Sequence, residues 1–214
     1  MSIKWLFFDV GSTLLNEEDA QKVRFKKVEA DIEAKLGKKI NFDEFSSAME
    51  EGATLRNNSP FSYATKKFGL NKKYLYSSKY ETIYPEAKEV LTILKSKFKI
   101  GIIANQPPAL AERIKVHGLS ECVDAVFGSD DVGLEKPGTE IYAYALSSVG
   151  CKAEEAVMIG DRLDNDIIPA KKIGMKTIRI LQGYFSSVTV LSDEETPDYT
   201  ITSLMEILDL FENI

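Results

Sequence analysis

The sequence is poor in the residues on which several classes of protein depend. Its 214 residues include two cysteines, Cys122 and Cys151, and one histidine, His117. Two cysteines are too few for a disulfide framework, which favours a reducing compartment and a cytoplasmic location. His117 comes late in a predicted helix, next to Gly118, where its charge would complement the helix dipole. We therefore assign it no catalytic role.

Long apolar runs and excess positive charge are also missing. No apolar stretch approaches the ~20 residues of a membrane-spanning helix, and the N-terminal residues do not resemble a signal peptide. Lysine and arginine number 27 against 33 acidic residues, a formal net charge of −6, which argues against nucleic-acid binding. A small anionic ligand stays compatible with this charge, because a local cluster of donors overrides a weak overall field.

What the sequence does contain is a repeated strand–helix pattern in most of its length. The nearly continuous apolar run at residues 3–8 ends in "DVGS", as expected of a strand buried on both faces. Pro85 then opens a predicted helix, residues 99–105 read as a buried strand, and the alternation continues to a terminal helix in 203–214. Repeated β–α units predict an α/β fold with a doubly wound parallel sheet.

Residues 16–82 have a different sequence pattern, with apolar residues at helical spacing. Asn16 and Asn41 are placed as N-caps of amphipathic helices, Gly37 as the end of the first, and two shorter helices are expected in 59–69 and 71–80. The segment contains no convincing strand. The predicted organisation is an α/β domain of residues 1–15 and 83–214, with a small all-helical domain of residues 16–82 inserted after the first strand.

Polar side chains follow three of the predicted strands, at the points where those strands end. Asp9 follows the first strand, Asn105 the strand "KIGII" and Asp161 the strand "AVMI". Ligands of open α/β sheets bind beyond the carboxyl ends of the strands. Lys136, in the loop "LEKPG", and Asp166, in "GDRLDND", are expected close by.

This combination of groups indicates phosphoryl transfer. Carboxylates that converge on one crevice repel one another unless a cation lies between them, and an oxygen-only cluster favours Mg²⁺. A lysine beside such a cluster would hold a phosphoryl oxygen and neutralise charge. The chemistry expected is transfer of a phosphoryl group to an aspartate, followed by hydrolysis of the aspartyl phosphate.

The motifs resemble those of the haloacid dehalogenase (HAD) superfamily, with a helical cap inserted after the first motif. The stretches that carry the resemblance are "FFDVGSTL", "IGIIAN", "LEKP", "VMIGDRLDNDIIPAKKIGM" and "PDYTITSLMEIL". The resemblance implies a Rossmann-like core. It also implies the site roles: Asp9 and Lys136 catalytic, Thr13, Asn105 and Lys136 substrate-binding, and Asp9, Gly11 (through its carbonyl), Asp161 and Asp166 binding Mg²⁺.

Two positions depart from the pattern of the family's phosphatases. Gly11 stands where a second aspartate usually serves as general acid, and Ala104 stands where a serine or threonine usually binds a phosphoryl oxygen. Loss of a general acid typically costs ~10²–10⁴ in rate. Neither change removes the nucleophile or the metal ligands.

The function expected is a Mg²⁺-dependent phosphatase acting on a small phosphate ester, with weakened acid catalysis. A catalytically silent phosphate- or Mg²⁺-binding protein is the main alternative, since both departures favour it, and dehalogenase chemistry is a lesser one. Asn105 could instead satisfy backbone groups in its turn, and Asp164 and Asp166 could complement a helix dipole. We expect no nucleic-acid or membrane partner, and a monomer or weak dimer.

Overall fold

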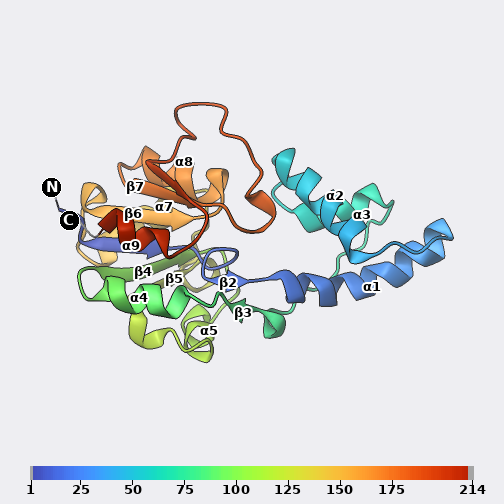
Figure 1. Cartoon of the computed structure of the whole chain (residues 1–214), viewed down its shortest axis with the longest axis horizontal. Helices are drawn as coiled ribbons and strands as arrows, with labels where there is room; N and C mark the ends of the chain where they lie inside the picture. The colour runs from blue at the N-terminus through green and yellow to red at the C-terminus, as the bar shows by residue number, and fades with distance from the viewer. Residues whose placement is uncertain (1, 212–214) are drawn as a thin grey trace. The chain divides into compact units, whose positions relative to one another are not determined.

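The computed structural model describes residues 2–211 and divides the chain into two compact units (Figure 1). The first consists of Met1–Leu15, Ile83–Gln182 and Val190–Ile214, and the second of Asn16–Thr82 and Gly183–Thr189. Among the described residues, no helix is long and apolar enough to cross a membrane.

A six-stranded sheet forms the centre of the first unit. Its order is β5-β4-β1-β6-β7-β8, and all of its pairings are parallel. The strands are β1 (Trp5–Phe8), β4 (Lys99–Ala104), β5 (Ala125–Gly128), β6 (Ala156–Gly160), β7 (Lys176–Ile180) and β8 (Tyr199–Ile201). The change of direction in strand order occurs at β1, and β1 is buried between β4 and β6. The predicted doubly wound parallel sheet is confirmed.

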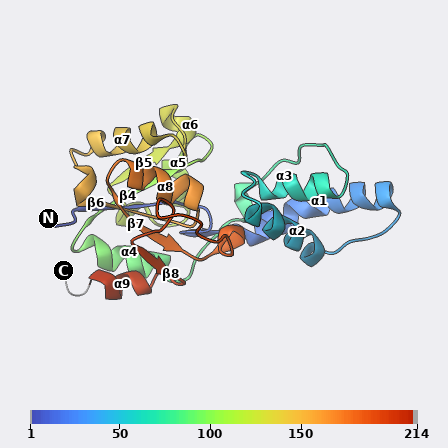
Figure 2. The same ribbon diagram turned by 90° about the horizontal axis from the view of Figure 1, so that it is seen from above.

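Helices cover both faces of this sheet (Figure 2). One face packs against α4 (Ala87–Lys95), α5 (Leu110–Val116) and α9 (Glu206–Phe211), and the other against α7 (Thr139–Ser148) and α8 (Ile168–Lys172). The short helix α6 (Ser129–Val132) follows β5 directly. The apolar runs of the sequence are explained by this burial, since the central strands have no solvent-facing side.

In the first unit, strand β8 was not predicted, and part of the predicted terminal helix cannot be compared with the structure. Strand β8 was not expected, because its three residues include the exposed Tyr199 and Thr200 and lie at the edge of the sheet. The predicted terminal helix forms over Glu206–Phe211, and residues 212–214 of that prediction lie outside the described part of the chain.

The second unit contains α1 (Glu18–Leu36), α2 (Phe42–Thr54) and α3 (Pro60–Lys67). Asn16 accepts a hydrogen bond from the backbone N–H of Glu18, and Asn41 forms a capping box with Glu44. Gly37 ends α1 in the left-handed conformation, at φ 66°. The helices bury an aromatic core that includes Phe25, Phe45 and Phe61. The predicted caps Asn41 and Gly37 are therefore confirmed, whereas the N-cap of α1 is Glu17 and Asn16 lies one residue before it.

The helix predicted at 71–80 is wrong. Only Ser78–Tyr80 forms a 3₁₀ turn, labelled η1, and the preceding residues 71–77 are irregular. Tyr74 is buried there because it contributes to the aromatic core, and its hydroxyl donates to Asp31. Packing of Tyr74 into the aromatic core, and not the spacing of apolar residues along a helix, therefore determines the conformation of this segment.

The boundaries of the helical unit also differ from the prediction. Short strands β2 (Leu15–Asn16) and β3 (Thr82–Ile83) pair where the chain enters and leaves it. Residues 183–189, assigned to the α/β domain from sequence, group with the helical unit instead. Tyr184 of this segment packs against the aromatic core, which supplies the physical reason.

Candidate active site

Neighbouring strands bring Asp9 and Asp161 to one edge of the sheet. Strand β1 pairs in parallel with β6, with Phe8 opposite Ile159, and the backbone N–H of Asp9 donates to the Ile159 carbonyl at 2.9 Å. Asp9 follows β1 directly and Asp161 follows β6 directly. Both residues are buried, Asp9 at 9% exposure and Asp161 at 3%.

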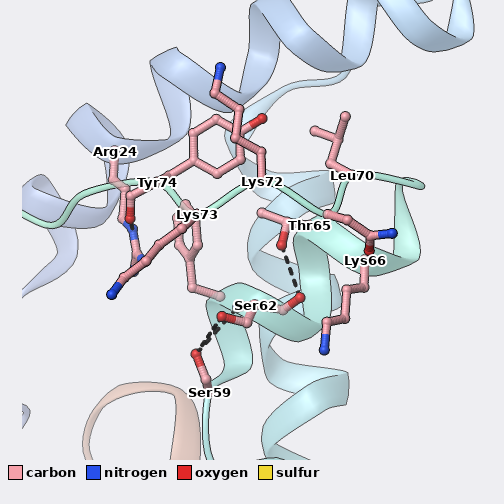
Figure 3. Close-up of a pocket in the computed structure, with 11 residues that line it drawn as sticks. Arg24, Ser59, Ser62, Thr65, Lys66, Leu70, Lys72, Lys73 and Tyr74 are labelled. Atoms are coloured by element: carbon pink, nitrogen blue, oxygen red, sulfur yellow. Dashed lines mark hydrogen bonds between the residues drawn. The ribbon is translucent and has the colours of Figure 1, made fainter.

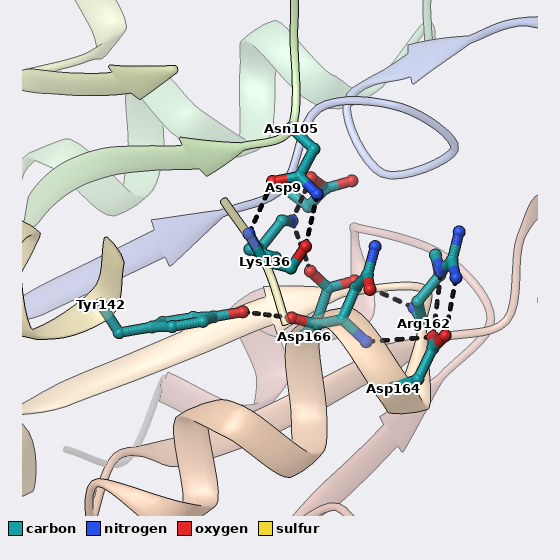
Figure 4. A network of polar contacts seen from close by, with 8 residues as sticks. Asp9, Asn105, Lys136, Tyr142, Arg162, Asp164 and Asp166 are labelled. Atoms are coloured by element: carbon teal, nitrogen blue, oxygen red, sulfur yellow. Dashed lines mark hydrogen bonds and ion pairs between the residues drawn. The ribbon is translucent and has the colours of Figure 1, made fainter. Parts of the chain in front are cut away.

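Lys136 lies between two carboxylates of this site (Figure 4). Its Nζ is 2.6 Å from Oδ1 of Asp9 and 2.6 Å from Oδ1 of Asp166, and its side chain is 2% exposed. Burial by itself lowers the pKa of Lys136, but attraction to Asp166 and Asp9 outweighs burial and raises it. The lysine is therefore a fixed positive charge in contact with the carboxylate of Asp9.

Asp166 approaches the sheet in a place that only glycine leaves open. It belongs to a single π-helical turn, η4 (Leu163–Ile167), and its Oδ2 accepts the backbone N–H of Arg162 at 3.0 Å. A Cβ atom on Gly160 would lie 2.4 Å from the Asp166 carboxyl carbon. Single π-helical turns are frequent at functional sites. The glycine of "IGD" thus makes room for the third carboxylate.

The three carboxylates meet the requirements of a hard divalent cation. One oxygen from each of Asp9, Asp161 and Asp166 lies within 4.8 Å of the others. Burial raises the pKa of Asp161 well above its usual range, and the charges of Asp166 and Asp9 add to that effect. Burial likewise raises the pKa of Asp166, to about 6, against the opposing effect of Lys136. An all-oxygen set of buried, mutually repelling carboxylates is what Mg²⁺ would stabilise.

These shifts predict a pH-dependent stabilisation by Mg²⁺. Because burial raises the pKa of Asp166 in the folded protein to about 6, above its ordinary value of 3.8, metal-free protein loses stability as the pH rises through 6. Mg²⁺ would bind the deprotonated carboxylates and reverse this loss. At 100 times Kd a ligand contributes ~2.7 kcal/mol, so Tm should rise by roughly 5–10 °C at pH 7.5. At pH 5.5 the rise should be clearly smaller.

The measurement is a thermal melt with Mg²⁺ and with EDTA at both pH values. In Asp166→Asn, which retains the size of the side chain, the Mg²⁺-induced shift at pH 7.5 should largely disappear. Equal shifts at the two pH values, or a full shift in Asp166→Asn, would contradict the assignment of Asp166 to the metal site.

Asn105 is engaged with the backbone of Lys136. Its Nδ2 donates to the Lys136 carbonyl at 2.7 Å, and its Oδ1 accepts the Lys136 N–H at 2.8 Å (Figure 4). The pair of bonds ties the end of β4 to the lysine loop. Asn105 thus satisfies backbone groups of the Lys136 loop and not, as the alternative expected, of its own turn. A role in binding substrate stays a prediction.

The remaining predicted residues lie in or beside the loop after β1. The backbone N–H groups of Thr13, Leu14 and Leu15 converge on the Val10 carbonyl. Thr13 is fully buried, and within the described residues its hydroxyl has no hydrogen-bond partner, so backbone contacts hold this turn. Gly11 forms a bridge with Leu15. Its carbonyl stays a predicted metal ligand.

The turn that contains Asp166 is supported by Tyr142 and Arg162, two side chains that were not predicted from the sequence. Tyr142 of α7 is fully buried, and its hydroxyl donates to the carbonyl of Asn165 (Figure 4). Arg162 forms a two-point ion pair with Asp164, at 3.0 and 2.7 Å, which outweighs burial and lowers the pKa of Asp164. Asp164 thus pairs with an arginine next to the site. Tyr142 shares the buried face of α7 with Ile141 and Leu146, whereas Tyr144 is exposed.

The chain is similar to known hydrolases in sequence and in fold. The family model described as haloacid dehalogenase-like hydrolase matches residues 3–174. A glyceraldehyde 3-phosphate phosphatase of Pyrococcus furiosus is 30% identical, over 98% of this chain and 93% of its own length. A protein of the same name from Methanocaldococcus jannaschii is 40% identical over 133 residues, which are 61% of this chain and 57% of that protein.

A solved structure has the same fold over nearly the whole chain. The crystal structure of a HAD phosphatase from Thermococcus onnurineus matches with a TM-score of 0.67 and 27% sequence identity, and the match covers 97% of each chain.

Proposed function

The chain belongs to the haloacid dehalogenase-like hydrolases, and from this premise we propose that it is a Mg²⁺-dependent phosphatase of small phosphate esters. The observation that carries the proposal is the buried cluster of Asp9, Asp161 and Asp166, in which one lysine contacts two of the three carboxylates. Such a cluster combines a nucleophile, a cation-binding set and a fixed positive charge in one place.

Asp9 is assigned the role of nucleophile. One of its carboxylate oxygens attacks phosphorus, the ester P–O bond breaks, and the departing oxygen takes up a proton from solvent water, since Gly11 offers no acid. Water then attacks the aspartyl phosphate, releasing inorganic phosphate and restoring the Asp9 carboxylate. Mg²⁺ held by Asp9, Asp161, Asp166 and the Gly11 carbonyl would supply charge stabilisation for the transferred phosphoryl group.

Lys136 is assigned the role of holding Asp9 and a phosphoryl oxygen. Its Nζ already contacts Asp9 at 2.6 Å, so it orients the carboxylate and offsets negative charge as the phosphoryl group arrives. Asn105 positions the lysine loop through its two backbone hydrogen bonds. Thr13 and Asn105 retain the substrate-binding roles proposed from the family resemblance.

The proposed substrate is a small phosphorylated metabolite. Relatives named glyceraldehyde 3-phosphate phosphatase and phosphoglycolate phosphatase support this class. The helical unit of residues 16–82 is proposed as the cap of the enzyme. The two cysteines are free, in keeping with the proposed cytoplasmic location.

Activity assays with and without metal test the proposal. Purified protein should release phosphate from a panel that includes glyceraldehyde 3-phosphate, 2-phosphoglycolate and p-nitrophenyl phosphate in Mg²⁺. EDTA should lower the rate by at least 100-fold, and Mg²⁺ should restore it. Chloride release from 2-chloropropionate without phosphate release would favour dehalogenase chemistry. Absence of all turnover, with Mg²⁺ still raising Tm, would favour the silent binding protein.

A further inference from the structure

The helical unit contains a pocket of its own, separate from the carboxylate cluster (Figure 3). Its volume is about 350 Å³, and all of its lining residues lie between Arg24 and Tyr74, within the helical unit. Four of them are cationic, namely Arg24, Lys66, Lys72 and Lys73, and none is acidic. The chain as a whole has a formal net charge of −6, so the charge of this pocket is opposite in sign to that of the chain.

Arg24 is the most constrained of the four cations. Its guanidinium carbon lies 3.6 Å from the centre of the Phe61 ring, and its Nε donates to the Tyr74 carbonyl at 3.0 Å. Among the described residues, no carboxylate lies within ion-pair distance of it, and burial lowers its pKa. Attraction to Tyr76 and Glu17 offsets part of this burial but does not outweigh it. Burying a charge is unfavourable, so an anion next to Arg24 would be stabilised.

Two lysines add positive charge that the protein does not neutralise. Within the described residues, neither Lys66 nor Lys73 forms an ion pair, and both are exposed at the pocket. Lys72 differs, because its Nζ is 2.9 Å from Asp31. In Figure 3 the side chains of Arg24 and Lys73 extend to one side, and that of Lys72 to the opposite side. The unneutralised charge is thus carried by Arg24, Lys66 and Lys73.

We propose that this pocket binds the phosphate group of a small phosphorylated molecule, at a site distinct from the carboxylate cluster of the α/β unit. Arg24 and Lys73 supply charge. The hydroxyl of Ser62, which accepts from the Ser59 hydroxyl at 2.9 Å, supplies a further donor. Guanidinium and ammonium groups with hydroxyl donors form a set suited to phosphate.

The aromatic side chains of the pocket argue against a ligand that contains a nucleobase. The face of the Phe61 ring is covered by Arg24, and the Lys72 ammonium lies 5.3 Å from the centre of the Tyr74 ring. Ring faces that are already occupied by cations are not free to stack on a nucleobase. The volume and the charges therefore fit inorganic phosphate, pyrophosphate or a short phosphate ester better than a nucleotide.

A nuclear magnetic resonance titration of the full-length, metal-free protein tests the proposal. The probes are inorganic phosphate, pyrophosphate and glycerol 3-phosphate, added to ¹⁵N-labelled protein. Metal is omitted so that the carboxylate cluster repels the same anions. Backbone signals of Ser59, Ser62 and Lys73 should shift in a saturable way. Pyrophosphate should bind more tightly than phosphate, and 300 mM NaCl should weaken both because it screens the charges.

A pair of matched double variants separates this pocket from general surface charge. Lys66→Met with Lys73→Met should weaken pyrophosphate binding at least tenfold. Lys26→Met with Lys27→Met removes the same charge from exposed positions of α1 outside the pocket, and should change binding less than twofold. Tighter binding of glycerol 3-phosphate than of phosphate would identify a phosphate ester as the ligand, and the reverse would identify free phosphate.

Three results would overturn the proposal. These are shifts confined to the α/β unit, no saturable shift with any probe, and equal weakening in the two double variants. None of these outcomes depends on turnover, so failure here is distinguishable from failure of the proposed phosphatase activity.

Discussion

Replacement of Asp9 by asparagine is expected to lower kcat by at least 10⁴-fold, the order found when a covalent nucleophile is removed. The amide retains the shape of the side chain but is not a nucleophile at phosphorus. It also removes one of the two carboxylates that contact Lys136. The measurement is phosphate release in Mg²⁺ under saturating substrate, with acid-quenched labelling by a ³²P-substrate to detect the aspartyl phosphate.

The fold should survive this change, because Lys136 still pairs with Asp166 at 2.6 Å. Asp164→Asn is the matched control, since Asp164 is close in sequence to the metal cluster but pairs with Arg162. We expect it to change kcat less than tenfold and to leave the ³²P label in place. Undiminished turnover in Asp9→Asn would remove Asp9 from the mechanism and with it the proposed chemistry.

The positions of the site residues along the fold could be predicted from sequence, because parallel strands place their carboxyl ends at one edge of the sheet. Asp9 and Asp161 follow adjacent strands for this reason. Lys136 is 127 positions from Asp9, yet the two side chains are in contact. The order of the motifs, more than any single spacing, made that contact predictable.

The supporting contacts could not be predicted in the same way. Asn105 could equally have faced a substrate or the backbone, and the choice depends on how the loop of Lys136 packs, which a single strand-end residue does not reveal. Tyr142 contacts the backbone of Asn165 from a helix on the sheet face. Helical spacing places Tyr142 on the buried face of α7, but it does not reveal which backbone group the hydroxyl meets. The need for glycine at position 160 could not be predicted either, because it arises from the Asp166 carboxyl group that packs against its Cα.

The organisation of the helical unit was harder to predict where packing overrides local pattern. Residues 183–189 follow a strand of the α/β unit, so sequence order assigns them there, whereas Tyr184 packs with the helical core. The tyrosine-rich segment around Tyr74 resembles a helix in composition but is held by side-chain burial and by a hydrogen bond to Asp31. In both cases one tyrosine that packs on the aromatic core, the buried Tyr74 or the partly buried Tyr184, decides the assignment.

Gly11→Asp is expected to raise kcat on alkyl phosphates by ~10²–10⁴, the range typical of a general acid. An alkoxide leaving group needs a proton as it departs, and the family resemblance places the missing acid at position 11. The backbone permits the change, because Gly11 is not among the glycines with positive φ. Its bridge to Leu15 is made by the main chain and does not depend on the side chain.

Comparison of leaving groups makes this prediction specific. p-Nitrophenolate departs without a proton, so the gain on p-nitrophenyl phosphate should stay below about tenfold while glycerol 3-phosphate gains much more. Gly11→Asn is the matched control: it adds a side chain of the same size without an acid, and should raise neither rate. Only Gly11→Asp should make kcat on the alkyl substrate fall at alkaline pH, as the acid loses its proton. Equal gains on both substrates, or a gain in Gly11→Asn, would show that position 11 acts by filling space and not by donating a proton.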